Sequence, residues 1–460
     1  MTGADTGSFG PSGPGASAAP ADARDRAIRR LARRARQFPD LAIGSVETGG
    51  LDPRDAALAR AIDEGVVRRW LTLSFLLREL SGHELATLEP KMQGVLLAGA
   101  FQLLFLDRVP DHAVLDESVG WAKANIRPKA SGFANAILRK VANARGEPRD
   151  AWTNAPDEIP LDSGGALALV GLTLPNDDAE RTSVATGVPR ALIDRWIIAW
   201  GTDEARRIAH HSIARAPTIL RTAHDPDWTD APGTSPHAER GHRVFAGSHA
   251  DLESLLGANP RIWAQDPASA GAVASVAGLA PKLIADVCAG RGTKTRQLAE
   301  TFPDARIVAS DPDADRAKDL RAAFADHPRV EVMPPDRARE ACLSRADLVL
   351  LDVPCSNTGV LARRPEARHR AGDAAVARLV DIQRQILADA IPLLAPAGVI
   401  LYATCSVERA ENEDQAAWAE RWHGVARDRE RRCLPSGGPG TPAGEHTDGG
   451  YSVLLRPGAG

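Results

Sequence analysis

The second half of the chain alternates short apolar runs with stretches of helical spacing, and this alternation constrains the fold more than any other feature. The apolar runs are β-prone, and the segments between them place apolar residues three or four positions apart. Such alternation predicts a parallel sheet covered by helices on both faces, from residue 244 to residue 460. The predicted strands are Leu283 to Val287, Arg306 to Ser310, Val330 to Met333, Leu348 to Leu351 and Val399 to Ala403.

The first half of the chain has helical periodicity instead. Residues 22–146 predict a compact all-helical domain, in which Gly99 and Gly132 allow close contacts between helices. Residues 147–243 predict a connector with one short helix, then a helical stretch at Arg190 to His211 and a loop. Beyond a first helix from Asp22, the helices expected in the first domain run from Pro53 to Arg69, Leu71 to Leu80, Lys91 to Leu106, His112 to Ala124 and Gly132 to Ala144.

The first predicted helix has a strongly basic face. Ile28 and Leu31 recur at helical spacing, and two interpretations of the arginines around them remain open: a solvated face in an arginine-rich chain, or a helix that contacts phosphates. The arginines are Arg26, Arg29, Arg30, Arg33, Arg34 and Arg36.

Composition limits the classes of protein to consider. With 460 residues, 43% hydrophobic and 25% charged, the chain is expected to form two or three globular domains. A net charge of -4 provides no global cationic field, so any nucleic-acid surface must be local. No apolar run reaches the roughly 20 residues of a membrane span. Residues 1–21 lack the pattern of a signal peptide and are expected to form a disordered tail in the cytoplasm.

The five cysteines form no short metal-type pair, so we expect neither a metal site nor a disulfide framework. Two of them stand where chemistry is expected. Cys355 follows the fourth predicted strand and Cys405 the fifth, and ligands of open parallel sheets bind beyond the carboxyl ends of the strands. A buried cysteine is usually inert packing, but these two lie in polar loops, and we expect exposed thiols with chemical roles.

A cofactor site is expected after the first two strands. Asp286 to Thr295 forms a glycine-bearing turn that opens a helix, where small residues let a ligand approach the backbone. Asp311 ends the second strand, where a carboxylate can accept both hydroxyls of a ribose. Together these features predict an adenosine-type cofactor. The alternative for Asp311 alone is a helix N-cap.

These turns resemble those of the Sun, or RsmB-like, members of the RNA cytosine-5 methyltransferases. The family's cofactor turn reads Asp-x-Cys-Ala-Ala-Pro-Gly-Gly-Lys-Thr, and here Gly290, Arg291 and Thr293 replace Ala, Pro and Gly. Further similar segments are Asp352 to Ser356 with Thr358 to Val360, Thr404 to Val407 with Glu411 to Glu413, Trp263 to Ser269, and Asp448 to Tyr451.

The N-terminal helices resemble the NusB-type RNA-binding domain, through Leu51 to Asp55, Gly99 to Pro110 and Gly132 to Arg139. The combined resemblance implies an all-α NusB-like domain followed by a Rossmann-like α/β methyltransferase domain with a seven-stranded, mostly parallel sheet. The pairing of these domains favours the ribosomal RNA branch of the family over the transfer RNA branch.

The resemblance implies methylation of C5 of a specific cytosine in small-subunit (16S) ribosomal RNA. Because C5 is a poor nucleophile, a thiolate first adds to C6. In the family this thiol belongs to the Thr-Cys-Ser motif, hence Cys405. Asp352 would hydrogen-bond the cytosine at N3 and its amino group, and Cys355 would assist removal of the C5 proton.

The resemblance also implies S-adenosylmethionine as cofactor. Lys294 could pair with the methionine carboxylate or with a catalytic acid, and an ordinary surface lysine is the alternative. Asn357 is expected to narrow the cytosine pocket. The implied cofactor contacts are Cys288, Ala289, Gly290, Arg291, Gly292, Thr293, Lys294, Asp311, Asp336 and Asp352.

The sequence leaves two alternatives to the ribosomal RNA enzyme open: a transfer RNA cytosine-5 methyltransferase, and a non-catalytic RNA-binding or chaperone protein. For the preferred function we expect RNA as the partner, without DNA or membrane, and a monomer in the cytoplasm.

Overall fold

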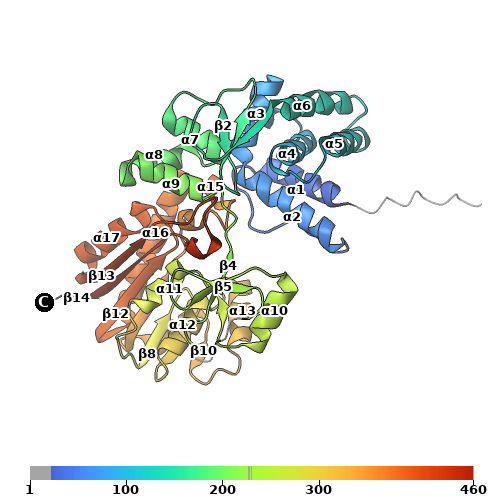
Figure 1. Ribbon diagram of the computed structural model, residues 1–460. Helices are drawn as coiled ribbons and strands as arrows, with labels where there is room; N and C mark the ends of the chain where they lie inside the picture. The colour runs from blue at the N-terminus through green and yellow to red at the C-terminus, as the bar shows by residue number, and fades with distance from the viewer. Residues whose placement is uncertain (1–21, 226–227, 229–230, 459–460) are drawn as a thin grey trace, which may run out of the picture.

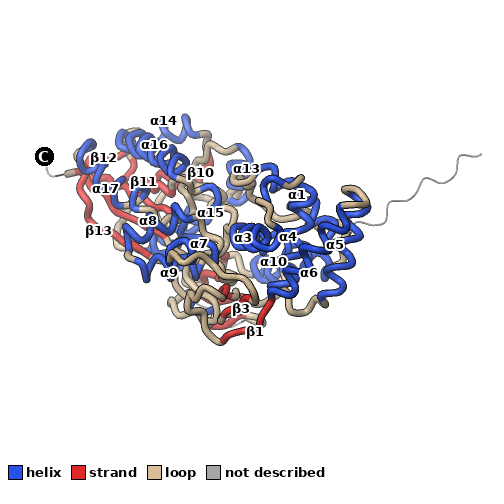
Figure 2. The backbone as a smooth tube through the Cα atoms, turned by 90° about the horizontal axis from the view of Figure 1, so that it is seen from above, coloured by secondary structure: helices blue, strands red, loops and turns tan. Residues whose placement is uncertain are grey.

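The computed structural model describes residues 22–225, 228 and 231–458. The predicted disordered tail, residues 1–21, lies outside the described residues. Helices of the N-terminal part occupy the upper right of Figure 1, and the large C-terminal sheet occupies the lower left. Seen from above, the same two parts lie at opposite ends of the molecule (Figure 2). Within the described residues, no helix is both long and apolar enough to cross a membrane.

The N-terminal part is a bundle built around one buried helix, α4, which contacts α1, α2, α3, α5 and α6. Every residue of α4 from Met92 to Leu104 is buried. Helix α2 begins with two common start signals. Asp52 is its N-cap and accepts hydrogen bonds from the N–H groups of Arg54 and Asp55, and Pro53 is its first residue. The helices are α1 (Ala23–Gln37), α2 (Pro53–Arg68), α3 (Trp70–Ser81), α4 (Pro90–Phe105), α5 (Asp111–Asn125) and α6 (Ala130–Ala144).

These bounds agree with the sequence prediction to within two residues. Gly99 allows the close contact predicted for it, because an added Cβ would lie 2.7 Å from Leu138 Cδ2 of α6. The prediction for Gly132 is wrong, since a Cβ there would meet no atom within 4 Å.

The predicted connector contains more structure than one helix. A three-stranded sheet, ordered β1-β3-β2, precedes the short helix α7 (Asp178–Thr186). Gly201, at φ 84°, divides the predicted helical stretch into α8 (Arg190–Trp200) and α9 (Thr202–His211). The three strands are β1 (Arg145–Arg149), β2 (Glu158–Pro160) and β3 (Ala166–Leu169).

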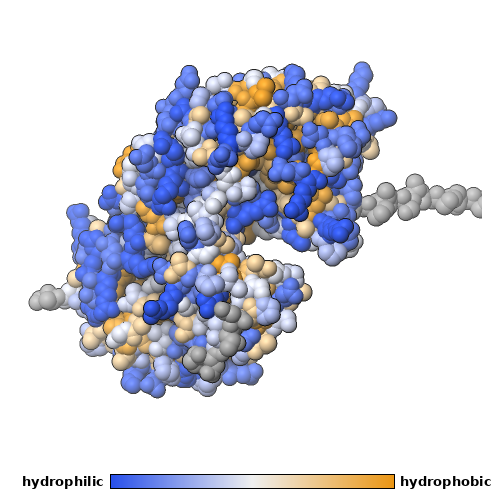
Figure 3. Space-filling view, in the orientation of Figure 1, coloured by the Kyte–Doolittle hydropathy of each residue, from blue (hydrophilic) through white to orange (hydrophobic). Residues whose placement is uncertain are grey.

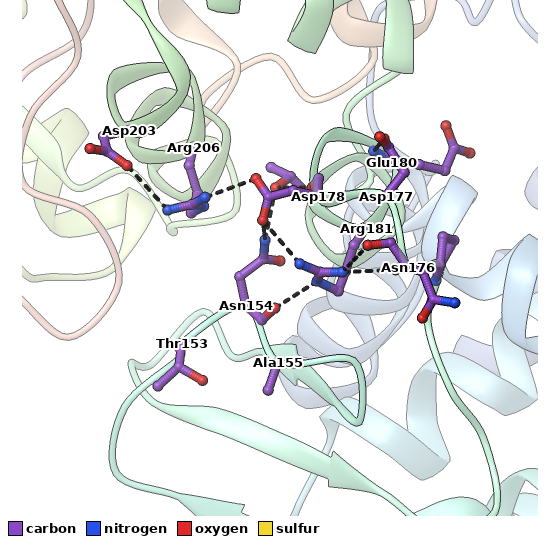
Figure 4. A network of polar contacts seen from close by, with 12 residues as sticks. Thr153, Asn154, Ala155, Asn176, Asp177, Asp178, Glu180, Arg181, Asp203 and Arg206 are labelled. Carbon is purple, nitrogen blue, oxygen red and sulfur yellow. Dashed lines mark hydrogen bonds and ion pairs between the residues drawn. The ribbon is translucent and has the colours of Figure 1, made fainter.

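A polar network joins this small sheet to the helices that follow it (Figure 4). Asp178 Oδ1 accepts hydrogen bonds from Asn154 Nδ2 and Arg181 Nη2, each at 3.0 Å. Its Oδ2 accepts from Arg206 Nη2 of α9 at 2.8 Å. One carboxylate therefore holds the loop after β1, the start of α7 and the middle of α9 together.

A second small sheet, ordered β5-β6-β4-β7, leads into the large domain. It includes part of the segment predicted as a loop between His224 and Arg243. The helix α10 (His249–Ala258) follows β6, with a capping box formed by Ser248 and Asp251. The strands are β4 (Thr218–Arg221), β5 (Thr234–Pro236), β6 (His242–Phe245) and β7 (Trp263–Ala264).

The large sheet has seven strands in the order β10-β9-β8-β11-β12-β14-β13. Neighbours from β10 to β12 are parallel, and β14 runs antiparallel to both β12 and β13. This confirms the predicted mostly parallel, seven-stranded sheet. The strands are β8 (Leu283–Asp286), β9 (Arg306–Ala309), β10 (Val330–Val332), β11 (Ala346–Asp352), β12 (Leu394–Thr404), β13 (Val425–Cys433) and β14 (Gly450–Pro457).

Helices cover both faces of this sheet, which explains the continuous apolar strands. Along β11, Val349 and Leu351 pack with α14, α16 and α17, whereas Leu348 and Leu350 pack with α11, α12 and α13. The covering helices are α11 (Pro267–Ala274), α12 (Thr293–Thr301), α13 (Ala314–Ala323), α14 (Pro335–Cys342), α16 (Asp373–Ala390) and α17 (Glu413–His423). The short helix α15 (Ala367–Arg370) packs with α8 and α9 instead.

The sheet edge formed by β13 is strongly polar. Arg427, Arg429 and Arg431 alternate with the acidic residues 428 and 430 along this strand, and most of its residues are exposed. In Figure 3 the corresponding left margin of the molecule is covered by hydrophilic residues. A charged edge resists pairing with strands of other chains.

Candidate active site

The strand order reverses between β8 and β11, and side chains at their carboxyl ends form the candidate site. From β8 the chain continues outward to β9 and β10, then returns to β11 on the other side of β8. Such a switch point leaves a crevice for a ligand beyond the strand ends. Asp286 ends β8 and Asp352 ends β11, and Cys405 follows β12.

Cys355 and Cys405 come together at this edge. Their Sγ atoms lie 3.3 Å apart, which is hydrogen-bond distance for two thiols, and Cys405 Sγ also donates to Asn357 Oδ1 at 3.3 Å. Cys405 is half-buried, but Cys355 is only 9% exposed, so the expectation of two exposed thiols is wrong for Cys355. The hydrogen bond with Cys405, together with burial, raises the pKa of Cys355 well above its usual value. Cys355 therefore keeps its proton in the resting protein.

Lys294 and Asp352 form an ion pair beside the thiols. Lys294 Nζ donates to Asp352 Oδ2 at 2.8 Å, and the lysine side chain is 13% exposed. Burial opposes the charge of Lys294, but the neighbouring carboxylate outweighs this effect and raises the lysine pKa. Of the interpretations open from the sequence, pairing with the acid is the one observed.

The turn between β8 and α12 requires glycine at position 292, both for its backbone conformation and for lack of space. Gly292, at φ 92°, is the N-cap of α12, and a Cβ there would lie 2.5 Å from Phe324 Cε2. The N–H of Gly290 donates to Asp311 Oδ2 at 2.9 Å. Asp313, not Asp311, caps α13, so the N-cap alternative for Asp311 is excluded. Asp311 instead joins the turn to the end of β9.

The remaining expected cofactor residues differ in position. Cys288 and Ala289 lie in the turn, and burial raises the pKa of the Cys288 thiol. Thr293 is the first residue of α12. Arg291 points to the surface, with a side chain 75% exposed and paired with Asp319. Asp336 is exposed in the first turn of α14, and no hydrogen bond or ion pair joins it to the other candidates among the described residues.

Asp286 is the first residue of the predicted cofactor turn, and the sequence alone predicts no role for it. Its Oδ2 accepts a hydrogen bond from Thr295 Oγ1 at 2.6 Å, whereas its buried Oδ1 has no partner among the described residues. Burial raises the pKa of Asp286 to about 7. An acid at the very end of the first strand was the available signal, because that position faces the crevice.

A small, partly open cavity of about 40 Å³ lies beside these groups. Its lining includes Lys294, Cys405, Asp266 and Asp448. Arg363 forms ion pairs with both of these acids, at 3.0 Å to Asp266 and 2.5 Å to Asp448. His446 lies against Asp448 as well, and the ligand atoms of Asp266, His446 and Asp448 fall within 4.8 Å of one another. The guanidinium of Arg363 therefore pairs with both carboxylates of this cluster.

The basic face of α1 is mostly used inside the bundle. Arg34 forms a buried ion pair with Asp63, Arg26 and Arg30 donate to backbone carbonyls, and Arg29 pairs with Asp25. Within the described part of the chain, Arg33 and Arg36 are exposed without a hydrogen bond or ion pair. Arg33 and Arg36 are therefore the two side chains of this face that remain available to contact phosphates.

A seven-stranded Rossmann-like sheet with a glycine turn at the end of its first strand, preceded by a helical bundle, defines an S-adenosylmethionine-dependent methyltransferase. The model of the 16S rRNA methyltransferase RsmB/F family matches residues 278–434, and that of the NusB family matches residues 22–143.

The chain is 31% identical to ribosomal RNA small subunit methyltransferase B of Sodalis glossinidius, covering 80% of this chain and 81% of that protein. It is 30% identical to the protein of the same name from Erwinia tasmaniensis, covering 88% and 91%. The chain therefore belongs to the RsmB/F family of 16S rRNA methyltransferases, and S-adenosylmethionine is its methyl donor.

Among solved structures, the chain resembles that of the protein PH0851, with a TM-score of 0.66 and 20% sequence identity over 94% of this chain and 98% of that one. This likeness supports the fold.

Proposed function

We propose that this rRNA methyltransferase methylates C5 of a cytosine in small-subunit ribosomal RNA through a covalent adduct with Cys405. The observation that carries the proposal is the pair of thiols 3.3 Å apart at the ends of adjacent strands. One thiol borders the cavity that also contains Lys294, and Lys294 holds Asp352. An enzyme acting on a nucleophilic nitrogen or oxygen would have no use for two adjacent thiols here.

The covalent step follows from the weak nucleophilicity of C5. In the proposed reaction the Cys405 thiolate forms a bond to C6, and the electron pair of the C5–C6 double bond forms the new bond from C5 to the methyl group. The methyl–sulfonium bond of S-adenosylmethionine breaks, and S-adenosylhomocysteine leaves. Loss of the C5 proton then restores the double bond and expels the Cys405 thiolate.

Asp352 is placed to stabilise the adduct. Its side chain is 34% exposed, so one oxygen can accept a hydrogen bond from the cytosine amino group while the other remains with Lys294. When C6 is attacked, N3 takes a proton from solvent, and the resulting N3–H can donate to the same carboxylate. The ion pair fixes the Asp352 carboxylate beside Lys294, which lines the cavity together with Cys405. This arrangement supports the role that the family resemblance implies for Asp352.

Cys355 is proposed to assist removal of the C5 proton. The hydrogen bond with Cys405 is the largest cause of its raised pKa. Once Cys405 is bonded to C6, this largest cause of the raised Cys355 pKa is removed, whereas burial and Glu411 still act on it. Cys355 can then release its proton to solvent and accept the proton from C5, so release of the RNA follows formation of the adduct.

The turn residues fit S-adenosylmethionine. The unpartnered, buried Asp286 Oδ1 suits the methionine ammonium, and Asp311 at the end of β9 suits the ribose hydroxyls. We also retain Cys288 to Lys294 as contacts along the turn, with Asp336 and Asp352. Arg291 contributes through its backbone in this proposal, because its side chain points to the surface.

We further propose a division of labour along the chain. Residues 22–146 bind RNA, and residues 244–460 bind the cofactor and the target base. Residues 147–243 connect these two domains. The curated relatives are named as small-subunit enzymes, which favours ribosomal over transfer RNA. A monomer in the cytoplasm, with RNA as its partner, completes the proposal.

The test is transfer of labelled methyl from S-adenosylmethionine to separated ribosomal and transfer RNA fractions. Wild type is expected to label small-subunit RNA at cytosine C5. Cys405→Ala is expected to be inactive, whereas Cys355→Ala is expected to accumulate a protein–RNA adduct on a denaturing gel. Labelling of transfer RNA alone, or activity in Cys405→Ala, would contradict the proposal.

A further inference from the structure

A buried carboxylate joins the two turns that carry the thiols. Glu411 ends the short 3-10 helix Arg409–Glu411 and is fully buried. Its Oε1 accepts hydrogen bonds from the backbone N–H of Ser356 at 2.9 Å and from Gln383 Nε2 at 3.0 Å. Its Oε2 accepts from Ser406 Oγ at 2.6 Å and from Ser356 Oγ.

Each of these serines directly follows a thiol in the chain: Ser356 follows Cys355, and Ser406 follows Cys405. The carboxylate therefore connects two turns that are 50 residues apart in sequence. Burial raises the pKa of Glu411, and the hydrogen bonds from Ser356, Ser406 and Gln383 oppose that rise. All four surrounding groups are donors, so the carboxylate can accept from each of them without a proton of its own.

The position of Glu411 is itself restrained from several sides. Tyr402 Oη, on β12, donates to the backbone carbonyl of Glu411 at 2.7 Å. Gln383, on α16, donates both to the carboxylate and to the carbonyl of Pro354 at 3.0 Å. The sheet and a covering helix thus hold the carboxylate in one place, so it can transmit a fixed geometry to both turns.

The charge of Glu411 also acts on the Cys355 thiol. After the hydrogen bond with Cys405 and burial, the negative charge of Glu411 is a further cause that raises the pKa of Cys355. A carboxylate next to one of two thiols favours the neutral form of that thiol.

We infer that Glu411 is a positioning residue that sets the distance between Cys355 and Cys405. This inference rests on the proposed two-thiol mechanism. Glu411 touches neither substrate nor cofactor in this scheme, and it acts through Ser356 and Ser406.

Glu413 offers a matched control two residues away. It is also a buried glutamate, 8% exposed, but its carboxylate pairs with Arg432 on β13. No hydrogen bond joins the Glu413 side chain to either thiol-bearing turn in the described structure. Glu413→Gln therefore removes a comparable buried charge but leaves the hydrogen bonds of the two thiol-bearing turns intact.

The experiment compares Glu411→Gln, Glu413→Gln and wild type. Since an amide nitrogen cannot accept from the serine hydroxyls, Glu411→Gln is expected to lower kcat by about 10²-fold. The KM for S-adenosylmethionine is expected to change by no more than about twofold. Adduct formation with RNA carrying 5-fluorocytidine is expected to slow in parallel, and Glu413→Gln is expected to match wild type in each assay.

Alkylation of the RNA-free protein by iodoacetamide, followed by peptide mass spectrometry, gives a readout that does not depend on activity. In Glu411→Gln, Cys355 is expected to react at a lower pH than in wild type, because the neighbouring negative charge is gone. A wild-type kcat together with a wild-type alkylation profile would overturn the inference.

If Glu411→Gln does not fold, the double variant Ser356→Ala/Ser406→Ala tests the same links with the carboxylate intact. Slow adduct formation is expected, and a wild-type rate would overturn the inference. A wild-type enzyme that forms no adduct would contradict the proposed function instead, while the alkylation profile would still test Glu411.

Discussion

The guanidinium of Arg368 donates a hydrogen bond of 3.0 Å to the backbone carbonyl of Arg68, a residue 300 positions earlier in the chain. Arg368 is completely buried, and within the described structure no carboxylate pairs with it. It donates instead to Thr186 O at 3.0 Å and to Ser212 O at 2.8 Å. These carbonyls lie at the C-terminal ends of α2, α7 and α9.

Three helix ends therefore surround one cation at the junction between the N-terminal bundle and the methyltransferase domain. The partial negative charge at each helix C-terminus favours the buried guanidinium, even though burial lowers its pKa. Because α15 lies in the loop that follows the Cys355 turn, this junction also connects the bundle to the catalytic edge.

Replacing Arg368 with alanine is expected to lower the free energy of unfolding by about 3 kcal/mol, since several buried carbonyls would lose their donor. Urea denaturation measures the change. Arg364→Ala, in the same loop but exposed, is the control and is expected to remain within about 0.5 kcal/mol of wild type. Equal effects of the two substitutions would contradict the role assigned to Arg368.

Removal of the Lys294 charge is expected to slow catalysis. Lys294→Met leaves Asp352 without its partner at 2.8 Å, so kcat is expected to fall by about 10²-fold. Steady-state methyl transfer measures this, and Lys282→Met, on an exposed lysine of the same domain, is the control. An unchanged kcat in Lys294→Met would show that the ion pair does not serve the reaction.

Cofactor affinity is expected to depend on pH through Asp286. Its pKa of about 7 means that the carboxylate is ionised above this value and neutral below it. A methionine ammonium prefers the ionised form, so the affinity for S-adenosylmethionine is expected to fall by up to about tenfold per pH unit below 7. Calorimetry between pH 5.5 and about 8.5 measures the profile, which is expected to flatten in Asp286→Asn.

Asp286 is expected to affect the stability of the cofactor-free protein in the opposite direction to cofactor affinity as the pH changes. A carboxyl whose pKa is raised by folding binds its proton more tightly in the folded state, so it stabilises the fold at low pH. That contribution is lost as the pH rises through about 7. Asp286→Asn is therefore expected to be more stable than wild type above pH 7 when no cofactor is present, as measured by thermal unfolding.

The cofactor turn is expected to tolerate a side chain at position 290 better than at position 292. Gly292→Ala places a Cβ 2.5 Å from Phe324, at φ 92°, and is expected to cost about 2 kcal/mol and to abolish tight cofactor binding. Gly290→Ala meets no atom within 4 Å and is expected to cost only about 1 kcal/mol. Thermal unfolding and calorimetry of both variants make the comparison, and equal losses would contradict the packing argument.

Arg33 and Arg36 are expected to contribute to RNA binding. The double alanine variant should reduce the slope of log affinity against log salt by up to about 2, if each side chain neutralises one phosphate. Filter binding to ribosomal RNA fragments at several salt concentrations measures the slope. Arg29→Ala, whose guanidinium is already paired with Asp25, is the control and should leave the slope unchanged. An unchanged slope in the double variant would favour the solvated-face interpretation.

The sequence predicted β8, β9, β11 and β12 because these strands are mostly buried, which requires a continuous apolar run. It also predicted β10, from the β-prone residues Val330 to Met333, although that strand is only partly buried. It did not find β13, because Val425–Cys433 is an exposed edge whose charged residues carry no apolar pattern. It also joined α8 and α9, since a glycine inside a helical pattern does not by itself show that the chain turns there.

What the sequence by itself determined is the local order of the chain: which segments form helices and strands, and that a glycine turn, an acid and two cysteines follow particular strands. The tertiary structure alone decided that Cys355 is buried, that it lies 3.3 Å from Cys405, and that Glu411 connects the two turns. Periodicity reports the face that a residue presents to the core, because backbone geometry repeats locally. Burial, charge and distance between residues 50 positions apart depend on how the elements pack, and no local pattern contains that information.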